Sequence, residues 1–368
     1  MRTWAECSEA ALRSNIRELR KRLGGAALVG VVKANAYGHG DIWASKILVE
    51  EGAAYLSVAT AEEAIALRGA GISAPILIFG ITPPELAPEL IGLGLTQTVA
   101  DIETAEAYSR AAQKFDKTMK CHLKLDTGMG RLGFQSAGDA RLASPEAVLA
   151  LTLPGLEFEG VYTHFAMSGE SGGETYTRGQ LAKFNAIVPE LERAAGIRFA
   201  LRHAANSGAV AGYPEAILDM ARPGIMLYGY PDNVPGLTLT PVMELKTRIA
   251  QIKRLAAGDS VSYGRRYTAA RPGRAAVLPI GYADGLPRAL SNNMCVLING
   301  KPARQIGTIC MDMCVVDLTD IPEARAGDTA TVFGREKGFT AEELAARLGT
   351  ISYELLCGVA NRVPRICI

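Results

Sequence analysis

Short apolar runs alternate with amphipathic segments over the first two-thirds of the chain. The runs are rich in β-branched residues and nearly free of charge, which is typical of strands buried in a parallel sheet. We expect strands at Leu28–Val32, Tyr55–Ala59, Pro75–Phe79, Leu95–Val99, Lys120–Leu125, Glu159–Phe165, Phe199–Ala204 and Asp219–Leu227. We expect helices at Glu9–Leu23, Asp41–Glu51, Ala61–Ala70, Ile102–Phe115 and Gln180–Ala195. About eight βα repeats predict an α/β fold with an N-terminal (β/α)8 TIM-like barrel.

A doubly wound open sheet is the competing architecture for this part of the chain. That fold places a glycine-rich phosphate loop after its first strand, and the segment Lys33–Ala36 is not such a loop. The barrel therefore remains the favoured interpretation.

The pattern changes at Pro231–Gly236, where Pro and Gly cluster as they do in linkers. Beyond this segment, short runs separated by turns predict a mostly-β C-terminal domain with one helix at Ala341–Leu348. The expected strands of that domain are Met243–Ile252, Ala275–Pro279, Met294–Ile298, Cys314–Leu318 and Thr329–Phe333. We therefore expect a barrel domain over residues 1–235 and a β domain over residues 236–368.

The composition is that of an ordinary globular protein, since 48% of the 368 residues are hydrophobic, 21% are charged and the formal net charge is +1. There is no dense run of Lys or Arg, so we expect no nucleic-acid partner. We expect no membrane span and no secretory signal. The seven cysteines are odd in number and scattered, which favours reduced thiols in a cytoplasmic protein. Cys310 and Cys314 have no histidine nearby, so no metal site is expected.

Lys33 is the first candidate for chemistry because it ends the apolar run of the first barrel strand. An amine that is partly desolvated there loses its proton more easily than a free lysine, whose pKa is about 10.4. Such an amine suits Schiff-base chemistry. The alternative is a strand-capping cation with its head in water.

Other reactive side chains also stand at or just after strand ends. In a barrel these ends share one mouth, where active sites are built. The residues are Arg131 after strand five, His164 at the end of strand six, His203, Asn206 and Ser207 after strand seven, and Arg222 in strand eight. Ser207 and Gly224 also suggest a phosphate site, because barrels of this type bind phosphate at the last two loops. An ordinary turn at Pro223–Gly224 is equally open.

Five motifs follow one another along the chain: Val31–Gly40, Lys124–Gly133, Ala221–Ile225, Ser262–Gly264 and Cys310–Asp312. In these motifs, and along essentially its whole length, the chain resembles the alanine racemase family of fold-type III pyridoxal-phosphate enzymes. The resemblance implies an isomerase that racemises L- and D-alanine with pyridoxal 5'-phosphate, supplying D-alanine as a peptidoglycan precursor.

The resemblance also implies how the cofactor is held. Lys33 would carry it as a Schiff base, Arg222 would face the pyridine nitrogen, and Arg131 would face the phenolic oxygen. Tyr37, Ser207, Gly224, Ile225 and Tyr353 would hold the phosphate, with His164 and Asn206 also at the cofactor. Because an arginine effectively never gives up its proton, Arg222 would disfavour protonation of the ring nitrogen and limit side reactions.

Racemisation needs a proton removed from one face of Cα and another delivered to the opposite face, so two groups are wanted. By the resemblance these are Lys33 and Tyr263, with His164 hydrogen-bonded to Tyr263. Arg131, Tyr263 and the backbone amide of Met311 would contact the small amino-acid substrate. In the family the tyrosine and the methionine come from the partner subunit, which implies a homodimer with shared active sites. A carbamylated Lys124 would pair with Arg131.

Three positions depart from the family pattern: Gly169 stands where an acid is common, Thr308 where an arginine is common, and Met313 where a glutamine is usual. Tyr282, Arg288 and Ile351 still match the access corridor. A serine or broad-specificity small amino-acid racemase is therefore an alternative. A fold-type III decarboxylase would want a glycine triplet and a catalytic cysteine, and a non-catalytic cofactor carrier would lack the second domain.

Overall fold

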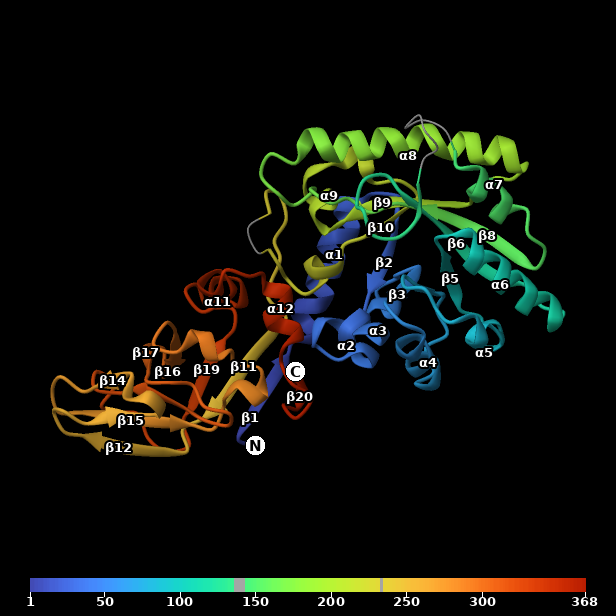
Figure 1. The fold of residues 1–368 in the computed structure, drawn as a ribbon. Coiled ribbons are helices and arrows are strands. Elements are labelled where there is room, and N and C mark those ends of the chain that lie inside the picture. Colours follow the sequence, from blue (N-terminus) through green and yellow to red (C-terminus); the bar gives the residue numbers. More distant parts are fainter. Residues whose placement is uncertain (136–142, 232–233) are drawn as a thin grey trace.

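The computed structural model describes residues 1–135, 143–231 and 234–368, and within them the chain forms two large sheets (Figure 1). The predicted linker Pro231–Gly236 lies partly outside the described residues, which omit positions 232 and 233. No helix in these ranges is both long and apolar enough to cross a bilayer.

The first sheet is a closed barrel of parallel strands in the order β5-β4-β3-β2-β10-β9-β8-β6, and pairing of β5 with β6 closes it. The barrel strands are β2 (Ala27–Val31), β3 (Tyr55–Val58), β4 (Ile76–Ile78), β5 (Thr96–Val99), β6 (Met119–Asp126), β8 (Leu156–Tyr162), β9 (Leu201–Asn206) and β10 (Met220–Arg222), with the short β7 (Phe134–Gln135) beside β6. The predicted TIM-like barrel is confirmed.

Helices surround the barrel (Figure 1). They are α1 (Glu9–Leu23), α2 (Lys33–Tyr37), α3 (Asp41–Glu50), α4 (Ala61–Gly69), α5 (Ala87–Gly92), α6 (Ile102–Lys114), α7 (Pro145–Leu151), α8 (Glu174–Ala195), α9 (Ser207–Gly212) and α10 (Gly224–Leu227). Side-chain caps satisfy the first free amides of several helices. Thr60 and Glu63 form a capping box at α4, and Asp101 accepts from the Thr104 amide at α6.

Three predicted strands differ from the structure. The strand predicted at Asp219–Leu227 is wrong beyond Arg222, because Pro223 offers no amide to the ladder and a helix begins at Gly224. The run Met243–Ile252 forms two strands with a turn after Arg248. Strand β8 ends at Tyr162, so His164 lies in the loop beyond the strand.

The second sheet forms the β domain and has nine strands in the order β12-β15-β18-β17-β16-β19-β11-β1-β20. They are β1 (Thr3–Cys7), β11 (Met243–Arg248), β12 (Gln251–Leu255), β15 (Gly273–Leu278), β16 (Cys295–Ile298), β17 (Lys301–Ile306), β18 (Cys314–Asp317), β19 (Thr329–Phe333) and β20 (Arg365–Cys367). A small ribbon of β13 (Ser260–Val261) and β14 (Tyr267–Thr268) and the helices α11 (Ala341–Leu348) and α12 (Ser352–Cys357) complete it. The two chain ends lie side by side in this sheet, because β1 pairs with β11 and β20 (Figure 1).

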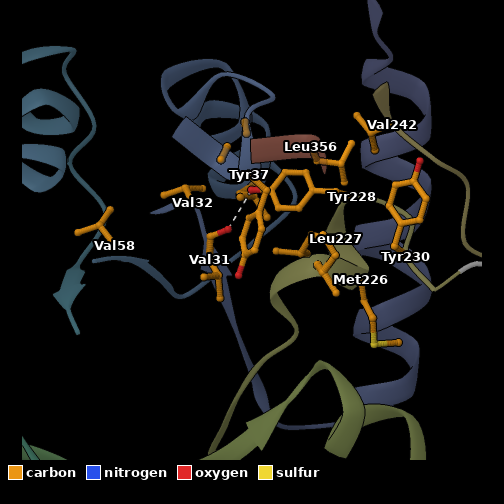
Figure 2. Close-up of a cluster of buried hydrophobic side chains, with 14 of the residues drawn as sticks. Val31, Val32, Tyr37, Val58, Met226, Leu227, Tyr228, Tyr230, Val242 and Leu356 are labelled. Carbon is orange, nitrogen blue, oxygen red and sulfur yellow. Dashed lines mark hydrogen bonds between the residues drawn. The ribbon is translucent and has the colours of Figure 1, made fainter. Parts of the chain in front are cut away.

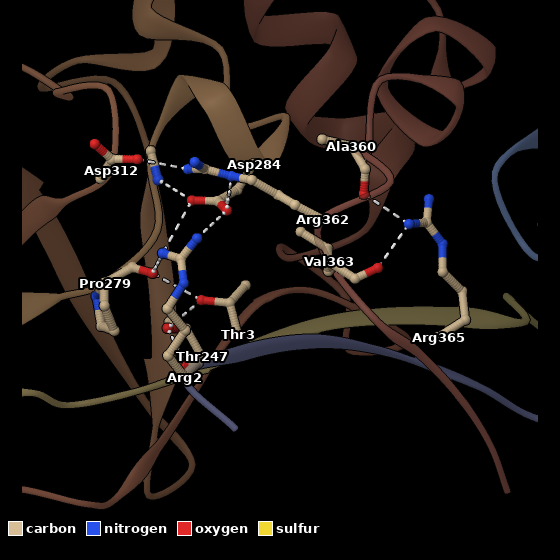
Figure 3. Close-up of polar contacts among 11 residues, drawn as sticks. Arg2, Thr3, Thr247, Pro279, Asp284, Asp312, Ala360, Arg362, Val363 and Arg365 are labelled. Atoms are coloured by element: carbon tan, nitrogen blue, oxygen red, sulfur yellow. Dashed lines mark hydrogen bonds and ion pairs between the residues drawn. The ribbon is translucent and has the colours of Figure 1, made fainter.

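A buried carboxylate ties the N-terminal strand to the C-terminal segment (Figure 3). Asp284 is fully buried and accepts from Arg2 Nη2 at 2.7 Å and from Arg362 Nε at 2.8 Å. Arg362 also donates to Asp312 at 2.7 Å. A buried charge is tolerated when it is paired and hydrogen-bonded in this way, so the network fixes the segment around Asp312.

Candidate active site

A cavity of about 1090 Å³ opens at the C-terminal ends of the barrel strands. Side chains from the barrel loops line it together with Ile351 and Tyr353 of the β domain. All ten residues that the resemblance implies for the cofactor lie in its wall: Lys33, Tyr37, Arg131, His164, Asn206, Ser207, Arg222, Gly224, Ile225 and Tyr353. The fold therefore brings together residues that are far apart in the sequence. Lys33 and Tyr353, for example, are separated by 320 positions.

The turn that follows Lys33 has an unusual backbone. The four residues Ala34–Tyr37 have φ between 52° and 54°, in the left-handed region. For residues with a Cβ this conformation costs about 1–2 kcal/mol each. The Ala34 amide donates to Glu63 Oε1 at 2.6 Å, and Arg365 Nε donates to the Gly38 carbonyl at 2.8 Å. These contacts hold a strained turn beside the lysine.

His39 stabilises the same turn through hydrogen bonds to its carbonyl groups. Its Nδ1 lies 2.9 Å from the Ala36 carbonyl and 3.0 Å from the Tyr37 carbonyl. Because both partners are acceptors, Nδ1 carries the proton and donates. Burial lowers the pKa of His39 to about 4, so the ring is neutral at pH 7. The imidazole thus acts as a fixed donor that orients Tyr37.

The Lys33 amine sits in an environment that favours its neutral form. Burial lowers the pKa of Lys33, and the nearby charge of Arg131 lowers it further. Glu63 acts in the opposite sense. A lysine held in this way is more nucleophilic at pH 7 than one in water.

Aromatic rings form the wall behind Tyr37 (Figure 2). The Tyr37 and Tyr228 rings lie 5.2 Å apart between centroids, and the Tyr228 hydroxyl donates to the Val31 carbonyl at 2.9 Å. Tyr353 meets Tyr37 edge-on at 5.8 Å. The packing places the Tyr37 hydroxyl next to Gly224, where a Cβ would lie only 2.4 Å from the oxygen.

Gly224→Ala should therefore disturb this wall. We expect the added methyl to displace the Tyr37 hydroxyl and lower the free energy of unfolding by about 1–3 kcal/mol, the usual cost of overpacking. Urea titration measures this. The matched control is Gly212→Ala, because a Cβ there meets no atom of the described residues within 4 Å. Equal stability of the two variants would contradict the close contact.

Asp126 shapes the loop that carries Arg131. Its Oδ1 accepts from the amides of Gly128, Met129 and Gly130 at 2.9, 2.8 and 3.1 Å, and its Oδ2 accepts from the Arg131 amide at 3.1 Å. Burial alone would raise the pKa of Asp126, but these four donors outweigh it and lower the pKa. The carboxylate of Asp126 thus fixes the conformation of the loop, and this conformation places Arg131 in the cavity wall.

Arg222 is buried at the end of β10, with 4% of its surface exposed. Its Nη2 donates to the carbonyls of Thr163 and Ala204 at 2.8 and 3.1 Å, and its Nη1 lies 2.6 Å from His203 Nδ1. His164 Nδ1 lies 3.4 Å from Nη2. Burial and the charge of Arg222 lower the pKa of His164 well below its usual value, so His164 is neutral at pH 7.

Lys124 is a second amine in the cavity wall, and unlike the half-buried Lys33 it is buried. Its Nζ lies 4.7 Å from the centre of the Tyr162 ring and 3.4 Å from the Leu125 carbonyl oxygen. Burial, and then the charge of Arg222, lower the pKa of Lys124 to about 7. Lys124 can therefore be neutral near pH 7, and burial shifts the pKa of Lys33 in the same direction.

Tyr263 and Met311 stand apart from this cavity. Their side chains are 73% and 53% exposed on the β domain, and within the described residues neither belongs to the cavity wall of its own chain. The Tyr263 carbonyl accepts from Thr308 Oγ1 at 2.7 Å, and Ser262 Oγ donates to the Thr308 carbonyl at 2.6 Å. The loop is well fixed although its aromatic side chain faces outward.

Sequence reasoning missed several residues that shape the site. Glu63 and His39 support the turn after Lys33, and Tyr162 lies under two cations, with Arg222 Cζ 5.3 Å from its ring centre. His122 lies two residues before Lys124, and alternate strand residues share a face. That spacing was a usable signal for a second polar residue inside the barrel.

A partly desolvated lysine and a buried arginine lie at the mouth of a (β/α)8 barrel, and Ile351 and Tyr353 of a second, β domain join the cavity wall. These features define a two-domain barrel enzyme. The family models for the N-terminal and C-terminal domains of alanine racemase match residues 7–232 and 242–367. The chain belongs to the alanine racemase family.

Individual relatives agree over nearly the full length. The chain is 44% identical over 360 residues to alanine racemase 2 of Caldanaerobacter subterraneus subsp. tengcongensis, covering 96% of this chain and 92% of the relative. It is 44% identical over 370 residues to an alanine racemase of Desulforamulus reducens, covering 99% and 98%. The solved alanine racemase of Clostridium difficile 630 superposes with a TM-score of 0.93 at 38% identity, covering 100% of this chain and 96% of that chain.

Proposed function

We propose that this chain interconverts L- and D-alanine with pyridoxal 5'-phosphate as its cofactor. The observation that carries the proposal is that one cavity contains both the partly desolvated amine of Lys33 and the buried guanidinium of Arg222. Membership of the alanine racemase family supports the same reaction.

The residues present suit the phosphate of this cofactor. Hydroxyl groups of Tyr37, Ser207 and Tyr353 all line the cavity. Gly224 has no space for a side chain beside Tyr37, which leaves its backbone open to a close approach. These groups would hold the phosphate, with the Gly224 and Ile225 amides beside them, while Lys33 would hold the aldehyde end.

When bound, pyridoxal phosphate supplies an electron-withdrawing ring that makes the Cα–H bond of an attached amino acid acidic. Arg222 would offer N–H donors to the ring nitrogen, and because it keeps its proton it would disfavour protonation of that nitrogen. Arg131 would place its charge beside the phenolic oxygen and the substrate carboxylate. Met311 of the partner subunit would offer its amide to the same carboxylate.

The chain's own groups would move the protons. For L-alanine, one base takes the Cα proton from one face and the other delivers a proton to the opposite face, so the reaction has no net gain of protons or electrons. We assign these roles to Lys33 and to Tyr263 of the partner subunit, with His164 beside the tyrosine. The exposed Tyr263 and its fixed loop support delivery to a second copy of the chain, and hence a homodimer with shared sites.

The direct test is incubation of the purified protein with L-alanine in deuterated water, followed by chiral analysis and mass measurement. We expect D-alanine that carries deuterium at Cα. Unlabelled L-alanine alone would contradict the proposal. Release of carbon dioxide from lysine, ornithine or diaminopimelate would instead indicate a decarboxylase.

Substrate breadth is tested with L-serine in the same assay. Thr308, one basis for expecting a relaxed access corridor, is 1% exposed, and its hydroxyl donates to the Tyr263 carbonyl, so it offers no surface to a substrate. Gly169 does line the cavity and adds no side chain there. We therefore rank alanine first and expect slower turnover of serine.

A carbamate on Lys124 is a separate proposal. Carbon dioxide adds to a neutral amine, forming an N–C bond and releasing one proton, and a pKa lowered to about 7 supplies neutral amine at physiological pH. The anion formed would offset the charges of Arg131 and Arg222. With ¹³C-bicarbonate we expect a carbamate NMR signal that Lys124→Met abolishes. A spectrum without this signal in the unsubstituted protein would refute the adduct.

A further inference from the structure

Arg222 is the first member of a line of polar groups that runs through the barrel interior, away from the cavity. His203 Nδ1 lies 2.6 Å from Arg222 Nη1, and His203 Nε2 lies 2.8 Å from His122 Nδ1. His122 Nε2 has no hydrogen-bond partner among the described residues, and it lies 3.6 Å from Oε1 of Glu159, so this last link is an electrostatic contact. These residues come from β10, β9, β6 and β8, which are four consecutive strands of the barrel sheet. Figure 1 labels these four strands.

The guanidinium fixes the direction of this line. Arg222 can only donate, so His203 Nδ1 must accept. Both imidazoles are completely buried, and burial lowers the pKa of each, so both are neutral. A neutral His203 then carries its proton on Nε2 and donates to His122 Nδ1. His122 in turn carries its proton on Nε2, the nitrogen that faces Glu159.

Glu159 ends the line as an anion. Its Oε1 also accepts from the Tyr55 hydroxyl and from Thr96 Oγ1, the latter at 3.1 Å, and its Oε2 lies 3.4 Å from the half-exposed Lys120 ammonium. Burial would raise the pKa of Glu159, but its contacts with His122 and Tyr55 outweigh that effect and lower the pKa to about 2.

The barrel wall leaves space for the central imidazole. A Cβ at Gly160 in β8 would lie 2.6–2.7 Å from the His122 ring atoms. The pairing of β6 with β8 also shifts register between Cys121 and His122. A residue with a side chain at position 160 would exclude the ring, so this strand accommodates the histidine through a glycine.

We propose that Glu159 is a positioning residue and counter-charge for Arg222, acting through the directed chain His203–His122. The carboxylate favours the proton on His122 Nε2, which keeps His203 Nδ1 an acceptor. That acceptor holds Nη1 and aims the remaining guanidinium donors at the cavity. The consequence for catalysis rests on the proposed function. The pyridine nitrogen of the cofactor, which would face Arg222, would stay unprotonated, and side reactions such as transamination would stay rare.

The test uses the full chain as purified, labelled with ¹⁵N-histidine. Only four histidines are present, so the spectrum is small enough to assign. In the unsubstituted protein we expect both His122 and His203 to carry their proton on Nε2. Glu159→Gln removes the charge and keeps nearly the same shape. We expect the Nε2–H proton resonances of both rings to move upfield, although of the two rings only His122 lies beside Glu159.

Two further variants serve as controls, and a third variant tests the same inference independently of Glu159→Gln. Glu157→Gln removes the same charge from the same strand at an exposed position, and Lys120→Met removes the cation on the outer carboxylate oxygen. We expect smaller shifts from both. Tyr55→Phe removes a hydroxyl that donates to Glu159, which makes the carboxylate a stronger acceptor, so both resonances should move downfield. Because the shift expected for Tyr55→Phe has the opposite direction, this variant tests the inference even if Glu159→Gln does not fold.

A His203 spectrum that does not respond to Glu159→Gln or Tyr55→Phe would overturn the inference, as would an Nδ1 proton on His203 in the unsubstituted protein. As a second measurement, the ratio of racemisation to pyridoxamine phosphate formation should fall several-fold in Glu159→Gln. Absence of racemisation in the unsubstituted protein would contradict the proposed function instead, and the imidazole spectra report on the chain independently.

Discussion

Replacing Lys33 by alanine is expected to lower kcat for alanine racemisation by at least about 10³-fold, the scale of losing an acid–base group. The variant should also lose covalently held cofactor, because Lys33 is the amine proposed to hold it. The strained turn that follows Lys33 depends on backbone contacts of Ala34, Ala36 and Gly38, so the fold should survive the truncation. Chiral chromatography and the absorbance of bound cofactor measure the two effects.

Two controls make the Lys33 experiment specific. Lys46→Ala removes an exposed amine from α3 and should leave racemisation unchanged. Lys124→Met removes the other amine of the cavity and should leave the cofactor bound while it reduces the rate of racemisation. Activity of Lys33→Ala within tenfold of the unsubstituted protein would exclude Lys33 as the base.

Mixing two inactive variants is expected to restore activity. Lys33→Ala and Tyr263→Phe should each be nearly inactive alone. If Tyr263 serves the partner's cavity, a dimer with one subunit of each kind contains one intact site, which combines Lys33 of one chain with Tyr263 of the other. Random exchange between twofold dimers then gives about a quarter of full activity. Racemisation of the mixture, followed after subunit exchange, measures this.

The same mixture tests the alternative arrangement. If Tyr263 acted within its own chain, each subunit of a mixed dimer would lack one base and the mixture would stay inactive. Subunit exchange must be shown independently, for example by mass spectrometry of intact mixed dimers. An inactive mixture of proven mixed dimers would overturn the shared-site proposal.

Much of the barrel could be predicted because its strands are continuous apolar runs. Helix α1 agrees with the predicted span Glu9–Leu23, since its apolar residues follow a helical period and Ser8 caps it. Strand β1 was not predicted, because its partners β11 and β20 lie far away in the sequence. Strand β17 was missed because Pro302 argues against a strand in a local reading.

The cavity wall was predicted better than the backbone that builds it. Lys33 and Arg222 could be found because polar residues at strand ends are conspicuous. The left-handed turn at Ala34–Tyr37 could not, since alanine favours right-handed helix and tertiary contacts from Glu63 and Arg365 override that preference. The tautomers of His122 and His203 likewise follow only from the direction that Arg222 imposes in three dimensions.

The most direct test of the central claim is to identify the amine that carries the cofactor. Reduction of the loaded protein with borohydride, followed by proteolysis and peptide mass measurement, should place one pyridoxyl group on the peptide that contains Lys33. A pyridoxyl group on the Lys124 peptide, or on no peptide, would contradict the account.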